Sequence, residues 1–260
     1  MNTNMKKMSI LLILLLPLVT VAAQQPNAVE VMNKSRELSI ASSLSATLKL
    51  TITEKNGSER NRTVSMTTKS YSGGLEKRLV RFLEPADVRG TAMLIVDHKD
   101  ATDEMWIYLP ALKKTRRIVS SEKGKSFMSS EFSNSDMTSP TIADFKHSFV
   151  GDQSSGNQWK IESIPVNDDK ADEYGFSKKV SYISKNKYEV MKMEFYNFDN
   201  ELFKVIETKA TFPMKDGRYM IKNMVASNLK SGRKSEILFN NIVEGGKVDD
   251  SVFTLQNLQQ

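Results

Sequence analysis

The residues best suited to catalysis in this sequence are its two histidines, because the chain has no cysteine. His147 stands close to Asp144 and Ser148, which are the residue types of a nucleophilic triad. No G-x-S-x-G turn accompanies them, although hydrolases of the α/β class use such a turn to expose their serine. We therefore interpret His147 as a surface or capping residue, predict no catalytic residues, and expect that the protein is not an enzyme.

The other histidine, His98, lies in a cluster of carboxylates formed by Asp97, Asp100, Asp103 and Glu104. These side chains could be read as a cation site, but they lack the ordered spacing of a calcium loop. They also fall where a hairpin between two strands should turn, so a solvated turn is the better interpretation. A glycine-rich phosphate loop is missing as well. The sequence thus predicts neither a metal site nor a cofactor.

Residues 104–137 carry the most informative chemistry. After a basic block, this segment places Phe127, Met128 and Phe132 among serines. Loops are usually polar because their backbone stays hydrated, so three large apolar side chains in a loop indicate a cover over an apolar surface. We therefore expect these three residues to form a lid and to contact a ligand in a cavity beneath it.

An aromatic pair, Trp106 and Tyr108, precedes the basic block on one face of an expected strand, with Met105 and Ile107 opposite. Aromatic side chains with polar tips can line the rim of a cavity and still form hydrogen bonds, which suits an amphiphilic ligand. Packing beneath the lid for stability alone is the alternative, and the sequence does not decide between them.

Residues 113–125 contain six lysines and arginines and a single acid. A solvated hairpin is the simplest interpretation of such a charge run. The functional alternative is that Arg116 and Arg117 contact anionic lipid head groups or an acidic partner. Arg117 could instead pair with Asp136 or Glu131 and so latch the lid.

Two-residue periodicity dominates the rest of the chain. From Leu44 onward, apolar residues that include Leu48 and Leu50 alternate with polar ones, as in a strand with one buried face. Asn56-Gly57 then gives a strong hairpin signal, and the later connections are short, so an antiparallel sheet is expected. The expected strands lie near 44–53, 59–70, 76–83, 91–97, 104–109, 115–120, 158–164, 176–185, 188–197, 202–212, 218–229 and 234–243.

Helices are expected to be few. Asn27 and Glu30 form the pattern of a capping box at the start of a short helix, whose apolar side would include Val29 and Met32. A second short helix is expected around residues 142–148. A sheet of about a dozen strands with so few helices cannot fill its concave side, so it encloses a cavity or is plugged. Periodicity alone fits a closed, lipocalin-like barrel equally well.

The amino-acid sequences of two segments resemble those of a known family. Trp106–Ile118 reads WIYLPALKKTRRI, and Phe127–Phe132 reads FMSSEF. This resembles the LolA/LolB-like outer-membrane lipoprotein-sorting proteins, in which W-x-Y-L-P-A-L-[KR]-[KR]-x-R-R-I precedes F-M-x-S-[DE]-F. That family usually has glycine where Ser129 stands here, and an aromatic-acidic pair where Asn134 and Ser135 stand. The resemblance implies a mostly β fold, with a large curved antiparallel sheet that forms an unclosed half-barrel covered by short helices and a lid loop.

The residues expected to face the cavity also include methionines. Met191, Met193 and Phe195 lie on one face of the strand at 188–197, which we take as the interior face. Thioether side chains are flexible and adapt to ligands of varied shape, such as acyl chains, although any single methionine more often fills a core. With Leu48 and Leu50, these residues complete the expected ligand-binding face.

The N-terminus has the pattern of a cleaved secretory signal in residues 1–23. Lys6 and Lys7 precede an apolar core at 10–19, and a small-residue cleavage site follows. The apolar run is shorter than the roughly 20 residues of a membrane-spanning helix. Cleavage would lower the formal net charge from +6 to +4, too small an excess for a nucleic-acid binder. We expect a periplasmic protein with one domain, residues 24–260, and no lipid tether.

The resemblance and the expected cavity together favour a periplasmic carrier or chaperone. It would bind the acyl chains of lipoproteins or lipids and transfer them towards the outer membrane, and weak contacts of the lid would set release. The expected partners are an inner-membrane transporter or an outer-membrane acceptor, and the protein itself is expected to be a monomer. The alternative is an envelope-stress sensor or an export-pump accessory that recognises lipidated partners on the same scaffold.

Overall fold

The structure is a computed structural model that describes residues 25–139, 141–153 and 155–260, so the expected signal at residues 1–23 lies outside the described residues. The described chain forms a 13-stranded sheet and three α-helices, α1 (Ala28–Ser39), α2 (Ser120–Lys123) and α3 (Asp168–Tyr174). The strands are β1 (Ser43–Thr53), β2 (Glu59–Ser70), β3 (Glu76–Glu84), β4 (Ala92–Asp97), β5 (Glu104–Leu109), β6 (Lys114–Ile118), β7 (Phe145–Phe149), β8 (Gln158–Pro165), β9 (Lys178–Ser184), β10 (Val190–Tyr196), β11 (Leu202–Pro213), β12 (Tyr219–Asn228) and β13 (Lys234–Glu244).

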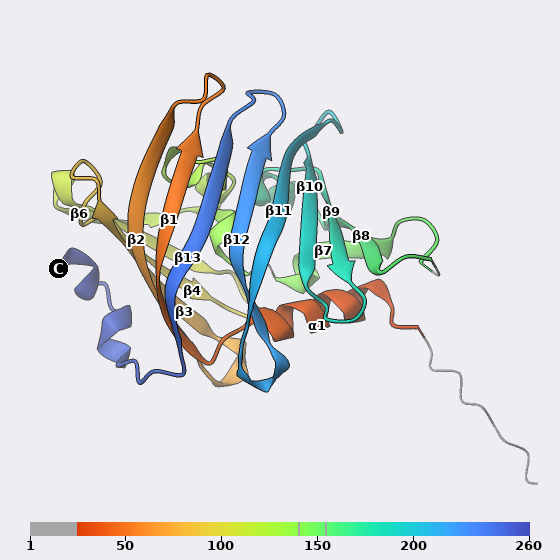
Figure 1. Ribbon diagram of the computed structural model, residues 1–260, viewed down its shortest axis with the longest axis horizontal. Helices are drawn as coiled ribbons and strands as arrows, with labels where there is room; N and C mark the ends of the chain where they lie inside the picture. Colours follow the sequence, from red (N-terminus) through yellow and green to blue (C-terminus); the bar gives the residue numbers. More distant parts are fainter. Residues whose placement is uncertain (1–24, 140, 154) are drawn as a thin grey trace, which may run out of the picture.

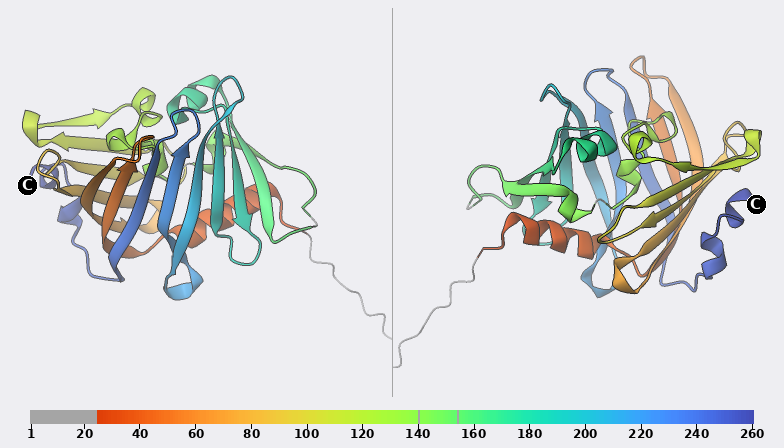
Figure 2. Two further views of the ribbon diagram at one scale, coloured as in Figure 1. Left: turned by 45° about the horizontal axis from the view of Figure 1, so that its top comes forward. Right: turned by 180° about the vertical axis from the view of Figure 1, so that it is seen from behind.

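The sheet is antiparallel throughout and is not closed into a barrel. Its order is β6-β5-β4-β3-β2-β1-β13-β12-β11-β10-β9-β8-β7, so β6 and β7 form the two edges. The sheet curves around a concave side, and α1 lies along that side near one end (Figures 1 and 2). This confirms the expected half-barrel and rules out the closed barrel that periodicity alone allowed.

The two edge strands are consecutive in the sequence although they lie at opposite ends of the sheet. The segment that joins them, residues 119–144, is called the bridging loop below. It contains α2 and three short 3-10 turns, at Phe127–Ser129, Ser135–Met137 and Ile142–Asp144. Figure 2 shows these turns on the concave side of the sheet. The bridging loop therefore spans the opening of the half-barrel.

Alternation predicts the strands well. All twelve expected strands are present with bounds within two residues of the expected ones. The helix expected at 142–148 is wrong, because only a 3-10 turn forms there before β7 pairs with β8. Helix α3 was not expected; Asn167 caps it by accepting a hydrogen bond from the backbone N–H of Lys170.

Helix α1 begins as the sequence predicts. Asn27 accepts a hydrogen bond from the Glu30 backbone, and the Glu30 carboxylate accepts one from Asn27. The buried face of the helix agrees with the expected one at Met32, which packs against the core of Val31, but not at Val29, which is exposed. Val31 packs with Trp159 on β8, so α1 is fixed to one end of the sheet.

Hydrophobic cores lie on both sides of the sheet, although the outer one covers only three strands. The large core lies on the concave side and combines inward side chains of the strands with Phe127 and Phe132 of the bridging loop. A smaller core lies on the outer side of β3, β4 and β5, where Phe253 and Leu258 of the C-terminal segment cover the strands. Figure 1 shows this C-terminal segment along the outside of the sheet.

Candidate functional site

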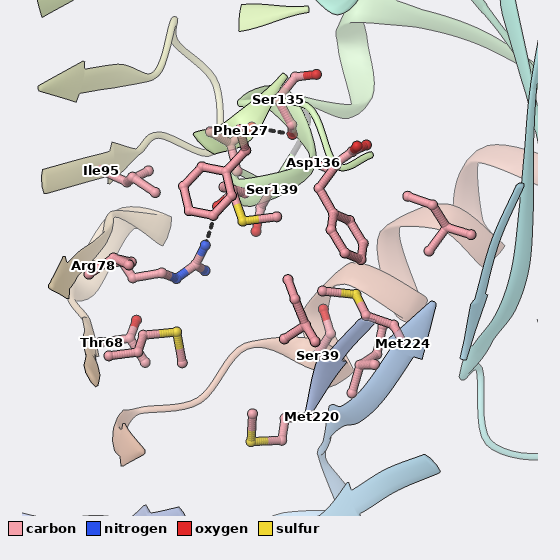
Figure 3. A pocket seen from close by; sticks show the side chains of 18 of the residues that line it. Ser39, Thr68, Arg78, Ile95, Phe127, Ser135, Asp136, Ser139, Met220 and Met224 are labelled. Carbon is pink, nitrogen blue, oxygen red and sulfur yellow. Dashed lines mark hydrogen bonds between the residues drawn. The ribbon is translucent and has the colours of Figure 1, made fainter. Parts of the chain in front are cut away.

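A pocket of about 300 Å³ lies between the concave face of the sheet and the bridging loop (Figure 3). The strands β1 to β4 and β9 to β13 supply its floor and walls, and residues 135–139 close it from the loop side. The lining is mostly apolar. Its larger apolar side chains are Leu44, Leu48, Val64, Met66, Val80, Ile95, Phe127, Phe132, Met137, Tyr174, Phe176, Met193, Phe195, Ile206, Met220, Ile221, Met224, Ile237 and Phe239.

Half of the ten predicted ligand-binding residues line this pocket. Leu48, Phe127, Phe132, Met193 and Phe195 line it directly. Leu50 and Met128 belong to the surrounding core but do not line the pocket. Met191 belongs to neither the core nor the pocket lining. The interior face chosen for β10 is therefore supported at two of its three predicted positions.

The prediction that Trp106 and Tyr108 line the cavity rim is wrong. Both side chains pack on the outer side of the sheet, in the small core with Phe253 of the C-terminal segment. The opposite face of β5 turns towards the concave core through Met105 and Ile107. The aromatic pair thus anchors the C-terminal segment and does not contact the pocket.

The predicted latch is also placed differently. Arg116 pairs with Glu122 at the surface, with Nη1 and Oε2 2.7 Å apart, and Arg117 stacks its guanidinium over the ring of Trp106. Asp136 pairs instead with Lys204 on β11, where Nζ and Oδ2 are 2.7 Å apart and both side chains are almost buried. Arg116 and Arg117 of the basic block therefore belong to the edge strand β6, and the contact that holds Asp136 comes from the sheet floor.

Basic residues of the sheet hold the bridging loop at several further points. Arg62 on β2 donates a hydrogen bond to the carbonyl of Met128. Arg78 on β3, which is labelled in Figure 3, donates one to the carbonyl of Met137. Arg233, just before β13, pairs with the buried carboxylate of Glu131 at 2.7 Å. The expectation of a weakly held lid is therefore wrong, since charge-assisted bonds of this kind are stronger than neutral ones.

The bridging loop is also fixed to helix α3. Lys123 Nζ lies 2.6 Å from Oε1 of Glu173, and both side chains are buried. Burial by itself raises the pKa of Glu173, but hydrogen bonds from Lys123 and Lys170 outweigh it and hold the pKa below 4.5. The backbones also touch here, because a Cβ on Gly124 would lie 2.8 Å from the Cα of Gly175. The two helices thus pack as one unit.

The loop conformation explains one departure from the family pattern. Ser129, where the family usually has glycine, has a φ of 63°, and Met128 beside it has a φ of 49°. Only glycine adopts this left-handed region without steric cost. The two bonds to the carbonyls of Met128 and Ser129, from Arg62 and Arg233, hold the turn in that conformation.

Two polar groups stand in or beside the apolar pocket. At one wall, Arg78 bonds to Glu76 and has a guanidinium nitrogen 3.8 Å from Oδ2 of Asp97. Burial raises the pKa of Asp97 to about 8, against the attraction of Arg78. At the opposite wall, burial lowers the pKa of Lys179 to about 8. The pocket therefore combines an apolar body with titratable groups at two sides.

The histidines form neither a catalytic triad around His147 nor a cation site around His98 in the described residues. His147 Nδ1 lies 2.8 Å from Oγ of Ser163, a fully buried serine on β8, while Asp144 pairs with Lys170. His98 donates its backbone N–H to Asp103, as in a turn. Within the described ranges, the structure has no group of three or more histidine and carboxylate side chains arranged to hold a metal ion.

The basic residues that hold the loop were missed by sequence reasoning, yet they carried a signal. Each lies in phase with the buried apolar positions of its strand. Arg62 precedes Val64 and Met66 at two-residue steps, and Lys204 precedes Ile206 in the same way. A basic residue at an even spacing from the buried apolar residues of a strand is therefore the sequence pattern that predicts these loop-binding residues. The set comprises Arg62, Arg78, Lys204 and Arg233.

Comparison with solved structures places the fold in a defined class. A putative outer-membrane lipoprotein-sorting protein domain from Vibrio parahaemolyticus is similar, with a TM-score of 0.81, 24% identity, and coverage of 90% of this chain and 98% of that one. A DUF1329 family protein from Desulfovibrio piger is similar with a TM-score of 0.80 and 23% identity, and the match covers 89% of this chain and 97% of that one. A LolA superfamily protein from Nitrosomonas europaea is similar with a TM-score of 0.69 and 16% identity, and the match covers 90% of this chain and 100% of that one. The chain therefore has the LolA-like half-barrel fold.

Sequence comparison adds the family. Residues 74–260 match the model of a family described as "Uncharacterized protein", and this match spans well over half of the chain. The chain therefore belongs to that family. No curated protein matches the sequence. Among the described residues, no helix has both the length and the hydrophobicity to cross a membrane.

Proposed function

We propose that the mature chain, residues 24–260 as one domain, is a periplasmic carrier that binds acyl chains of lipids or lipoproteins and transfers them towards the outer membrane. The observation that carries the proposal is the apolar pocket of about 300 Å³ on the concave side of the sheet. Its volume lies at the lower end of the range for pockets that bind small ligands, about 300–1,000 Å³. The lipoprotein-sorting and LolA structures with the same fold support the class of function.

The chemistry of the lining fits an acyl chain. Met193, Met220 and Met224 extend flexible thioethers from β10 and β12, and Phe239 adds an aromatic wall. Burial of apolar surface would drive binding with about 25 cal/mol for each Å² removed from water. Methionine side chains can repack around chains of different length, which suits a carrier with varied cargo.

Lipid retained during purification provides the first test. The protein is exported with its signal, purified from the periplasm without detergent, and analysed by native mass spectrometry. We expect species whose added mass corresponds to bound lipid. After delipidation, the protein should take up a fluorescent fatty acid. A protein that carries no lipid and takes up no fatty acid or acylated peptide would contradict the proposal.

A pocket-filling variant locates the binding. Met224→Trp should block uptake, because the indole would occupy pocket space beside Ile237, which lies opposite Met224 on β13. Leu229→Trp is the matched control, since Leu229 follows the same strand, is half exposed and lies outside the pocket lining. Equal uptake by the two variants would show that the fatty acid binds elsewhere.

A further inference from the structure

The wall of the pocket contains a lysine that has no ion-pair partner of its own among the described residues. Lys179 lies on β9 opposite Phe195 of β10, and it is in phase with Ser181 and Ile183, which are both buried. The side chain is 8% exposed, and it lines the pocket. A lysine so deeply buried is rare, because the ammonium loses its hydration there.

Aromatic rings surround this ammonium. Nζ of Lys179 lies 5.5 Å from the ring centroid of Phe145, 5.9 Å from that of Phe176 and 6.0 Å from that of Phe195. Ring faces attract a cation, but each contributes less than a carboxylate in a dry site. In the described part of the chain, the structure gives the ammonium of Lys179 neither a hydrogen bond nor an ion pair, and its close contacts are the aromatic rings.

The surrounding charges leave an excess of one positive charge. The carboxylate that attracts Lys179 is Asp136, but Lys204 Nζ already lies 2.7 Å from its Oδ2. The backbone N–H of Ser133 occupies the same oxygen. Lys204 in turn repels Lys179, and His147 nearby is driven towards its neutral form by burial, with repulsion from Lys179 adding to it. Two ammonium groups therefore share one carboxylate.

We infer that the pocket binds a single-chain amphiphile with an anionic head group, a carboxylate or a phosphate, and that Lys179 is the residue that pairs with this head group. The inference rests on the proposed carrier function and specifies its ligand. An incoming anion supplies the missing counterion in a site of low dielectric, where such a pair is stronger than in water. The acyl chain then extends over Met193, Phe195 and Met224 in the apolar body of the pocket.

The pocket volume favours one chain over several. About 300 Å³ of space is available with the bridging loop attached. This is the size of a small-ligand pocket, and a multiply acylated head group would need more room. A free fatty acid or an alkyl phosphate combines one chain with the required charge. Both carry the same recognition chemistry, so the test compares them directly.

Matched ligands of equal chain length test the inference in the delipidated protein. Dodecanoate, dodecyl phosphate and dodecanol are titrated at pH 7 by isothermal calorimetry. We expect one or both anions to bind about tenfold or more tightly than dodecanol, as for a hydrogen bond to a charged group. In Lys179→Met the preference for the anion should disappear, while dodecanol binds as in the wild type. Lys179→Arg should keep the preference.

Lys178→Met is the control variant on the same strand. Lys178 is partly exposed and pairs with Glu162, so its loss should leave every affinity unchanged. Raising the pH from 7 to 9.5 should weaken dodecanoate binding in the wild type, because the pKa of Lys179 is lowered to about 8 and the ammonium is lost across this range. Dodecanol binding should not change.

The outcomes separate this inference from the proposed function. If dodecanol and the anions bind the wild type equally, or if Lys179→Met keeps the anion preference, the role of Lys179 is overturned while the carrier function stands. If none of the three ligands binds, the carrier function falls and the inference falls with it. Unchanged dodecanol affinity in Lys179→Met shows that the variant retains a folded pocket.

Discussion

Lys204 Nζ lies 2.7 Å from Oδ2 of Asp136, and this pair joins the sheet floor to the bridging loop across the concave side. Both side chains are almost completely buried. A buried pair of this kind depends strongly on both partners, because removal of one leaves the other charged and without a partner. The loop is therefore fastened from inside the half-barrel.

Asp136→Asn should destabilise the protein by about 3–5 kcal/mol, the usual cost of leaving a buried charge unpaired. Here two ammonium groups, Lys204 and Lys179, would remain beside each other. The double variant Asp136→Asn, Lys204→Met should cost clearly less than the single Asn change, as measured by urea unfolding. Lys209→Met, which breaks the exposed pair with Glu207, is the control and should change stability by less than about 1 kcal/mol. A double variant that is as unstable as Asp136→Asn, or less stable, would contradict this account.

Phe132→Ala should lower the free energy of unfolding by about 3–5 kcal/mol, since the ring is fully buried and its loss leaves a cavity. Phe198→Ala serves as the comparison, because Phe198 is 62% exposed and its loss should cost less than about 0.5 kcal/mol. Chemical denaturation of both variants checks the difference. Similar stability of the two would mean that the loop does not contribute to the core.

Acid should loosen the contact between α2 and α3. The pKa of Glu173 is held below 4.5 in the folded protein, so its contribution to stability is present above pH 4.5 and is lost as the pH falls through the folded pKa. At pH 7, Glu173→Gln should cost about 3 kcal/mol, because Lys123 loses its buried partner. The gap in unfolding free energy between wild type and variant should narrow below pH 4. A gap that stays constant from pH 7 to pH 3 would refute this assignment.

Fluorescence can verify the corrected position of Trp106. Because the chain has two tryptophans, Trp159→Phe leaves Trp106 as the sole reporter. Phe253→Ala should shift its emission to longer wavelength, since Phe253 packs in the same outer core. Fatty acid binding should leave the emission unchanged. A large shift on ligand addition, with no effect of Phe253→Ala, would return Trp106 to the pocket.

The sequence was sufficient to predict every strand except β7, but it did not show which face of each strand is concave. In β5, alternation separates Trp106 and Tyr108 from Met105 and Ile107, but both sets are apolar because both faces of the strand are covered. Periodicity cannot then say which face is concave. The cover on the outer side comes from Phe253, more than 140 residues away, and local pattern carries no information about such a contact.

The site was predicted in its apolar part and missed in its charged part. Phe127 and Phe132 were recognisable because apolar residues in a loop must be buried somewhere. Lys179 and Lys204 were overlooked because a lysine in a strand is read as facing water. Their positions in phase with Ile183 and Ile206 become meaningful only when the concave face is known to hold a loop with an acidic residue, Asp136.

The order of the strands has a mechanical consequence. The bridging loop starts at the free edge β6 and ends at the free edge β7, so both of its ends are hydrogen-bonded into the rims of an open sheet. It therefore connects the two edges of the open sheet across the concave side. Under the proposed carrier function, a ligand larger than the resting pocket would have to displace this loop or spread the two edges of the sheet.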